Sequence, residues 1–74
     1  MDLQVKVDNA LKVIKSHMNG HQHEYITVIS SDDPFENTDV RRILLIKYQL
    51  EVKRKKRNKD GTVVYRVERL DYGV

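Results

Sequence analysis

The stretch EVKRKKRNKDGTVVYRV, residues 51 to 67, places five consecutive cations ahead of an Asn-Lys-Asp-Gly segment and a run of β-branched residues. Asn, Asp and Gly readily adopt the backbone angles of tight turns, so residues 58–61 predict a turn. Residues 62–70 have the composition of a strand. The simplest interpretation is a β-hairpin whose first strand carries the cations.

The stretch before this turn, residues 40–57, fits two periodicities. Apolar side chains fall on even positions, as in a strand, at Val40, Leu44, Ile46, Tyr48, Leu50 and Val52. A helical stripe behind a Thr38 cap is also present, formed by Val40, Ile43, Leu44, Tyr48 and Val52. Because a hairpin needs a strand on each side of its turn, we predict strands over about 40–56 and 62–71.

An amphipathic helix is predicted at the N-terminal end, over residues 2–19. Its apolar stripe consists of Leu3, Val7, Ala10, Leu11, Ile14 and Met18. Asp2 is the expected N-cap, and Gly20 is expected to end the helix. The alternation of Leu3, Val5 and Val7 leaves open a short first strand, with Asp8 capping a shorter helix.

Two segments lie between this helix and the hairpin. Residues 23–30 are almost all strand formers with apolar groups at both odd and even positions, which is typical of a strand buried on two sides. Residues 31–39 combine a proline with Asp, Asn, Ser and Thr, which bond their own backbone in turns. We therefore predict a strand and then a loop, with Phe35 folding back as the anchor of the loop.

These elements predict a single small α+β domain over residues 1–74, with an N-terminal helix packed on a three-stranded antiparallel sheet that ends in a long C-terminal β-hairpin. One helix covers one face of such a sheet. The other face is expected to expose apolar side chains, among them Tyr25, Ile29, Ile43, Leu45 and Val64. Because so short a chain buries only about 60% of its unfolded surface, we expect a homodimer or a protein partner to cover this face.

Composition excludes several classes of protein. The sequence contains no cysteine, which excludes a disulfide framework and a thiolate zinc site. The start, MDLQVKVDNA, lacks the pattern of a secretory signal, and no apolar run approaches the ~20 residues that span a bilayer. We expect a cytoplasmic protein with no membrane contact.

Charge is distributed unevenly along the chain. Residues 1–40 carry three lysines against seven acids, and residues 41–74 carry eleven Lys or Arg against four acids. Such a dipole favours either steering toward a polyanion or head-to-tail self-association.

The cation run is the strongest functional signal. The predicted nucleic-acid-binding residues are Lys53, Arg54, Lys55, Lys56, Arg57, Lys59, Arg66 and Arg69. On a regular strand, Arg54 and Lys56 would point to one face and the other three cations of the run to the opposite face. We expect a hairpin with these cations to neutralise phosphates of DNA or RNA. The structural alternative is a solvated tip whose cations prevent edge-to-edge aggregation.

Groups that read bases are scarce in the basic half, where the aromatic candidates are Tyr48, Tyr65 and Tyr72. We therefore expect contacts with the nucleic-acid backbone, and sequence specificity would have to come from a dimer.

Two clusters contain metal-ligand residue types. His17, His21 and His23 lie around the end of the predicted helix, and the loop offers Asp32, Asp33, Glu36 and Asp39. The histidines lack a fourth ligand, and the loop lacks the spacing of an EF-hand. Turn and capping roles explain both clusters, so no metal and no cofactor are predicted.

One short pattern suggests catalysis. Asp33 or Asp39, followed by Glu51 and Lys53, resembles the Asp, Glu-x-Lys motif of the restriction-endonuclease-like nucleases. The resemblance implies a metal held by two carboxylates and a lysine that assists attack on a phosphodiester. It covers only these residues, and that family surrounds its site with alternating strands and helices.

The sequence therefore predicts a small non-enzymatic binding protein that contacts nucleic acid, or a nucleoprotein complex, through a basic β-hairpin. The alternative is a protein-interaction module, an inhibitor or regulator, that uses the open sheet face and the acidic loop from Asp32 to Asp39.

Overall fold

A computed structural model describes residues 2–71. The elements are helix α1 (Leu3–Met18), strand β1 (His23–Ile29), a short 3-10 helix η1 (Ser30–Asp32), helix α2 (Thr38–Tyr48), and strands β2 (Leu50–Arg57) and β3 (Thr62–Arg69). The fold is α+β, as predicted, with one helix more than predicted. No helix among residues 2–71 has the length and apolarity needed to cross a bilayer.

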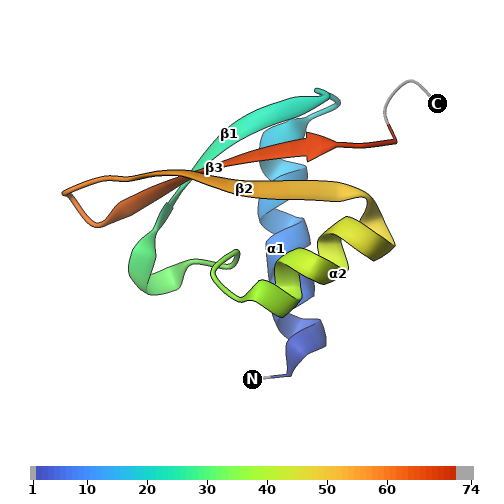
Figure 1. The fold of residues 1–74 in the computed structure, drawn as a ribbon, viewed down its shortest axis with the longest axis horizontal. Coiled ribbons are helices and arrows are strands. Elements are labelled where there is room, and N and C mark those ends of the chain that lie inside the picture. The colour runs from blue at the N-terminus through green and yellow to red at the C-terminus, as the bar shows by residue number, and fades with distance from the viewer. Residues whose placement is uncertain (1, 72–74) are drawn as a thin grey trace.

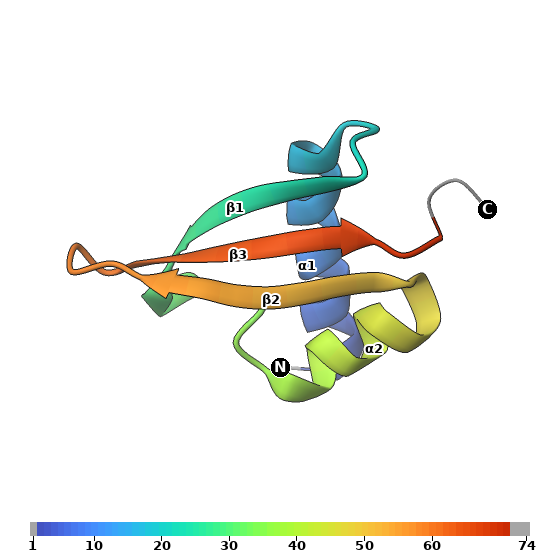
Figure 2. The same ribbon diagram turned by 45° about the horizontal axis from the view of Figure 1, so that its top comes forward.

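The three strands form one antiparallel sheet in the order β1-β3-β2, so that β3 is central and β1 and β2 are edge strands. Both helices pack on one face of this sheet, α1 against β1 and α2 against β2, and the opposite face has no covering element in the described chain (Figures 1 and 2). The β2–β3 hairpin extends past both helices (Figure 1).

The predicted strand over 40–56 is wrong in its first half, because residues 38–48 form α2. The Asn37 side chain caps this helix by accepting hydrogen bonds from the backbone N–H groups of Asp39, at 2.8 Å, and Val40, at 3.3 Å. Val40 and Leu44, four residues apart, are fully buried, whereas Ile46 is 73% exposed. The helical interpretation is therefore correct for residues 38–48, and the strand interpretation is correct only from Leu50 onward.

The N-cap of α2 gives a first test of this arrangement. We expect Asn37→Ala to lower the free energy of unfolding by about 1 kcal/mol, since two N–H groups of the first turn lose their acceptor. For a domain of this size the loss corresponds to a fall in Tm of about 4–8 °C. Thermal unfolding followed by circular dichroism measures it. Asn37→Asp, which keeps an acceptor oxygen, is the control and should restore most of the stability.

The predicted helix over 2–19 is confirmed as Leu3–Met18, which removes the alternative of a first strand. Asp2 is at the N-cap position, although its side chain makes no capping hydrogen bond. Asn19, with φ of 45°, and Gly20, with φ of 86°, turn the chain out of the helix in the left-handed region.

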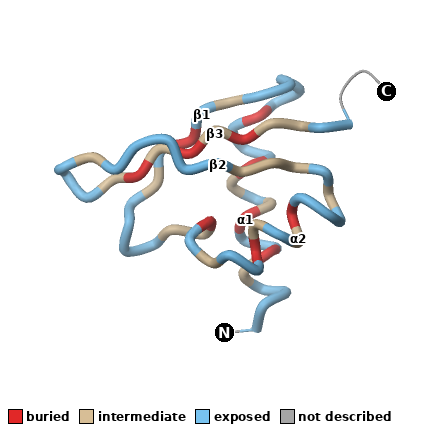
Figure 3. The backbone as a smooth tube through the Cα atoms, viewed as in Figure 1, coloured by how far each residue is buried: buried red, intermediate tan, exposed pale blue. Residues whose placement is uncertain are grey.

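Burial alternates along β1 and along most of β3. The buried core gathers residues from α1, α2, β1, β3 and the loop (Figure 3): Val7, Ala10, Ile14, Met18, Ile26, Phe35, Val40, Leu44, Val63, Tyr65 and Val67. In β1 only Ile26 is fully buried, while its odd residues are exposed. The prediction that this strand is buried on two sides was therefore wrong.

The predicted loop is anchored as expected, with Phe35 fully buried. Its ring meets that of Tyr65 on the central strand edge-on, with centroids 5.1 Å apart. Asp33 accepts a hydrogen bond from the Tyr65 hydroxyl at 2.5 Å and another from the Phe35 N–H at 2.8 Å. Arg41 on α2 donates to the Phe35 carbonyl at 3.1 Å. Burial, followed by the hydrogen bond to Asp33, raises the pKa of Tyr65 well above its usual range.

Candidate nucleic-acid interface

The tip of the hairpin is held by its own polar side chains. Asp60 accepts hydrogen bonds from the Thr62 N–H at 3.1 Å and from its hydroxyl at 2.6 Å, which lower the pKa of Asp60. Asn58 donates to the Thr62 hydroxyl at 2.9 Å, and Gly61 has a φ of 89°, as the predicted turn requires. The Asp60 carboxylate is therefore hydrogen-bonded within the turn itself, and the adjacent Lys59 is exposed.

A β-bulge in β2 decides where the cations point. Arg54 pairs with Tyr65, whereas Lys56 pairs with the next residue, Val64, so that Lys55 has no partner on β3. The extra residue shifts the alternation by one position. Lys53 and Lys56 therefore share the open face of the sheet, and Arg54 and Arg57 lie on the helix side. The prediction from a regular strand, which grouped Arg54 with Lys56, was wrong.

The register places two rows of side chains across the open face. Tyr25, Arg66 and Lys53 are neighbours in one row, because Arg66 pairs with both of the others. The next row is Thr27, Val64 and Lys56. Of the apolar residues expected on this face, Tyr25, Ile29 and Val64 are present. Ile43 and Leu45 are not, because they belong to α2.

Ion pairs restrain some of these cations. Arg66 contacts Glu68 at 2.9 Å, and this hydrogen bond raises the pKa of Arg66 and lowers that of Glu68. Lys53 lies 3.6 Å from Glu51. In the described chain no ion pair is found for the other cations of the hairpin arm, which are Arg54, Lys55, Lys56, Arg57 and Lys59. The arm therefore presents positive charge that the protein itself leaves uncompensated.

One predicted site residue lies away from the others. Arg69 is at the far end of β3, about 23 Å of strand from Thr62 at the turn. It pairs with Leu50, on the side of the helices, and contacts Asp71 at 3.9 Å. The structure therefore places seven of the eight predicted cations along the hairpin, divided between its two faces, and separates Arg69 from them.

An exposed aromatic residue that lies beside the cations was not among the three tyrosines named from the sequence as candidates for base contact. Tyr65 is in the core, Tyr48 is half-buried beside Lys47, and Tyr72 lies outside the described residues. Tyr25, 55% exposed, adjoins Arg66 on the open face. Tyr25 was expected on this face as an apolar residue, but it was not named as a candidate for base contact, because it lies outside the basic half of the sequence.

The alternative sites are not assembled. Among residues 2–71 no three His, Asp or Glu side chains gather into a metal-ligand set. His17 Nδ1 is bonded to the Val13 carbonyl at 2.8 Å, and His21 lies 3.5 Å from Glu24. For the nuclease-like pattern, Asp33 bonds Tyr65 on the helix side, whereas Glu51 and Lys53 occupy the open face.

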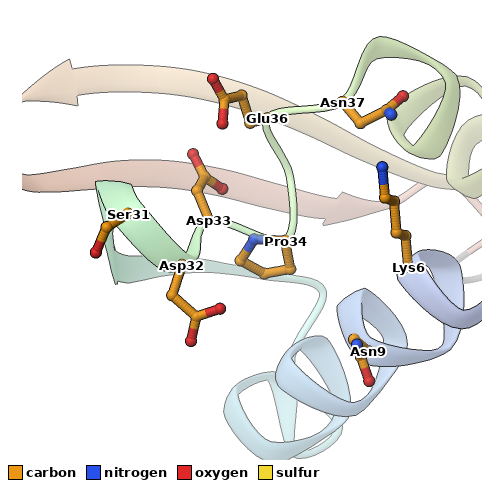
Figure 4. Close-up of a pocket in the computed structure, with 8 residues that line it drawn as sticks. All are labelled: Lys6, Asn9, Ser31, Asp32, Asp33, Pro34, Glu36 and Asn37. Carbon is orange, nitrogen blue, oxygen red and sulfur yellow. The ribbon is translucent and has the colours of Figure 1, made fainter. Parts of the chain in front are cut away.

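A pocket of about 420 Å³ lies between α1 and the acidic loop (Figure 4). Its lining includes Asp32, Asp33 and Glu36 from the loop, and Lys6 from the helix. This loop packs on the helix side of the sheet through Asp33 and Tyr65. Asp33 of the acidic loop therefore lies on the helix side of the sheet, opposite the open face.

Comparisons of the chain with protein-family models, curated proteins and solved structures find no match.

Proposed function

We propose that this protein binds the phosphate backbone of nucleic acid through the open face of its sheet and the basic arm formed by β2 and the hairpin turn, without catalysing a reaction. The observation that carries the proposal is the arm itself, a hairpin that extends past the helices with five cations unpaired within the described chain. Blocking edge-to-edge pairing needs fewer charges than this.

The open face adds a second element of recognition. Lys53, Lys56 and Arg66 lie on it beside the exposed ring of Tyr25. Lysine and arginine neutralise phosphates, and a base stacks on an aromatic ring whatever its identity. We therefore expect a preference for single strands and little dependence on sequence.

Fluorescence anisotropy of labelled single-stranded DNA, double-stranded DNA and RNA tests this proposal. Contact with about five phosphates of a duplex gives a slope of log affinity against log salt near −4.5, so binding should weaken several hundredfold between about 50 and 200 mM salt. Absence of binding at low salt to all three oligonucleotides would overturn the proposal. It would leave a protein partner of the open face as the remaining function.

Three double variants that remove the same net charge locate the interface. Lys53→Ser with Lys56→Ser removes two cations from the open face of β2, and Arg54→Ser with Arg57→Ser removes two from its helix side. Lys12→Ser with Lys15→Ser removes two exposed cations from α1. The first pair should reduce the magnitude of the salt slope by about 2, since about one counterion is released per phosphate contact. The α1 pair should leave the slope nearly unchanged. Equal effects of all three pairs would mean that binding follows net charge alone.

A further inference from the structure

The free edge of β1 is built to accept another strand. Two backbone hydrogen bonds flank its pairing with β3, from the Arg69 N–H to the Gln22 carbonyl and from the Ser30 N–H to the Gly61 carbonyl, each 2.8 Å long. In an antiparallel ladder, pairs that are hydrogen-bonded alternate with pairs that are not. Since Gln22 and Ser30 bond to the β3 side, the even-numbered residues of β1 also bond to β3. The N–H and carbonyl groups of His23, Tyr25, Thr27 and Ile29 therefore point to the free edge.

The two edges of the sheet differ in their protection. β2 carries a bulge and five consecutive cations, both of which discourage the addition of a strand. β1 has the sequence HEYITVI, with no Lys, Arg or Pro, and its register with β3 runs without a bulge. Among the edge-facing N–H groups of β1, that of Tyr25 is covered by the Glu24 side chain at 3.1 Å. The remainder of this edge is a template for β-sheet extension.

We propose that β1 pairs antiparallel with β1 of a second copy of this chain, with Thr27 on the twofold axis. In an antiparallel pair, the backbone N–H and carbonyl groups that face the partner strand bond to each other. On β1 these groups belong to the odd-numbered residues, and this register sets odd-numbered residues opposite odd-numbered residues. It sets Thr27 opposite its own counterpart and Tyr25 opposite Ile29 of the partner subunit. These are the two exposed large apolar side chains of the strand, at 55% and 62%.

Within the paired strands, no two residues of like charge face each other. Glu24, the one acidic residue of β1, falls opposite Ser30 of the partner subunit, and Ile26 falls opposite Val28 of the partner subunit on the helix side. Aromatic, β-branched and Thr–Thr cross-strand pairs each add stability to a sheet. A groove of about 550 Å³ between α1 and β1, lined in part by Val13 and Val28, leaves room for the partner's side chains. This self-complementarity favours a second copy over an unrelated peptide.

The resulting assembly is a continuous six-stranded sheet in the order β2-β3-β1-β1-β3-β2. Its twofold axis is perpendicular to the sheet, so both open faces lie on the same side and both remain uncovered. The inference stands independently of the proposed nucleic-acid function, although it would place two sets of cations on one surface.

Because the sequence contains no cysteine, a single introduced thiol reports the register directly. In the proposed dimer the two Thr27 Cα atoms are about 5.5 Å apart, within the range of about 4.4–6.8 Å that a disulfide spans. The two Ile29 Cα atoms are offset by four residues, about 13 Å. We expect Thr27→Cys to form a covalent dimer on mild oxidation, in the absence of nucleic acid, at least about tenfold faster than Ile29→Cys.

Sedimentation equilibrium gives the second measurement. Thr27→Lys sets like charges across the axis and should raise the dimer dissociation constant at least about fivefold. Gln4→Lys, which adds the same charge to an exposed position of α1, should leave it unchanged. Circular dichroism of each variant checks that the monomer still folds. A monomeric wild-type protein at the highest soluble concentration would overturn the proposal. So would a dimer that neither Thr27→Lys weakens nor Thr27→Cys crosslinks preferentially.

Discussion

Phe35→Ala should lower the free energy of unfolding by about 3–5 kcal/mol, the range for truncating a buried aromatic ring. Phe35 is fully buried and packs edge-on against Tyr65 of the central strand. The cavity would open where the loop, α2 and β3 meet, since the backbone of Phe35 also bonds Asp33 and Arg41. A core this small rarely supplies more than about 3–5 kcal/mol, so most of the variant should be unfolded at 25 °C.

Urea unfolding followed by circular dichroism measures this loss. The slope of the free energy of unfolding against urea concentration should be the same for the variant and the wild type, which checks that both proteins unfold in two states. Phe35→Leu is the matched control, because it keeps an apolar side chain of comparable reach and should recover a large part of the stability. A loss below about 1 kcal/mol for Phe35→Ala would show that the loop is not anchored in the core.

Leu44→Ala and Ile46→Ala should differ strongly, although the two residues are only two positions apart. Leu44 is fully buried on α2, and its truncation should cost about 2–5 kcal/mol. Ile46 is 73% exposed on the same helix, and its truncation should change the stability by no more than about 0.5 kcal/mol. Alanine also has the higher helix propensity, which offsets part of any loss at Ile46.

This pair separates the two periodicities of residues 40–48. On a strand, Leu44 and Ile46 would point to the same face and their truncations would cost similar amounts. On a helix they are 200° apart at about 100° per residue, so that one is buried and the other exposed. Thermal unfolding of both variants under identical conditions decides the matter. Equal losses would contradict the helix.

Local patterns predicted most of the elements correctly. The stripe of α1, the β-branched run of β3 and the Asn-Lys-Asp-Gly turn are set by residue type and spacing over short distances, and the structure confirms them. The anchoring role of Phe35 was also predicted, because a single large apolar side chain in a polar loop is stabilised when it packs into the core. The α+β class followed from these elements.

Three features depended on tertiary structure. The stretch 38–48 has apolar residues at both helical and alternating spacings, and burial of Val40 and Leu44 between α1 and the sheet selects the helix. The bulge at Lys55 has no signature within a run of five cations, yet it determines which cations share a face. The row of Tyr25, Arg66 and Lys53 joins residues from three strands.

The sequence by itself thus determined the identity of most local elements, because turn chemistry and side-chain periodicity act between residues that are near one another in the chain. Only the tertiary structure decided the order of the strands, the choice between two competing periodicities and the face on which each cation lies. Those properties arise from pairing and burial between distant segments, whose free energies exceed the weak local preferences of residues 40–57.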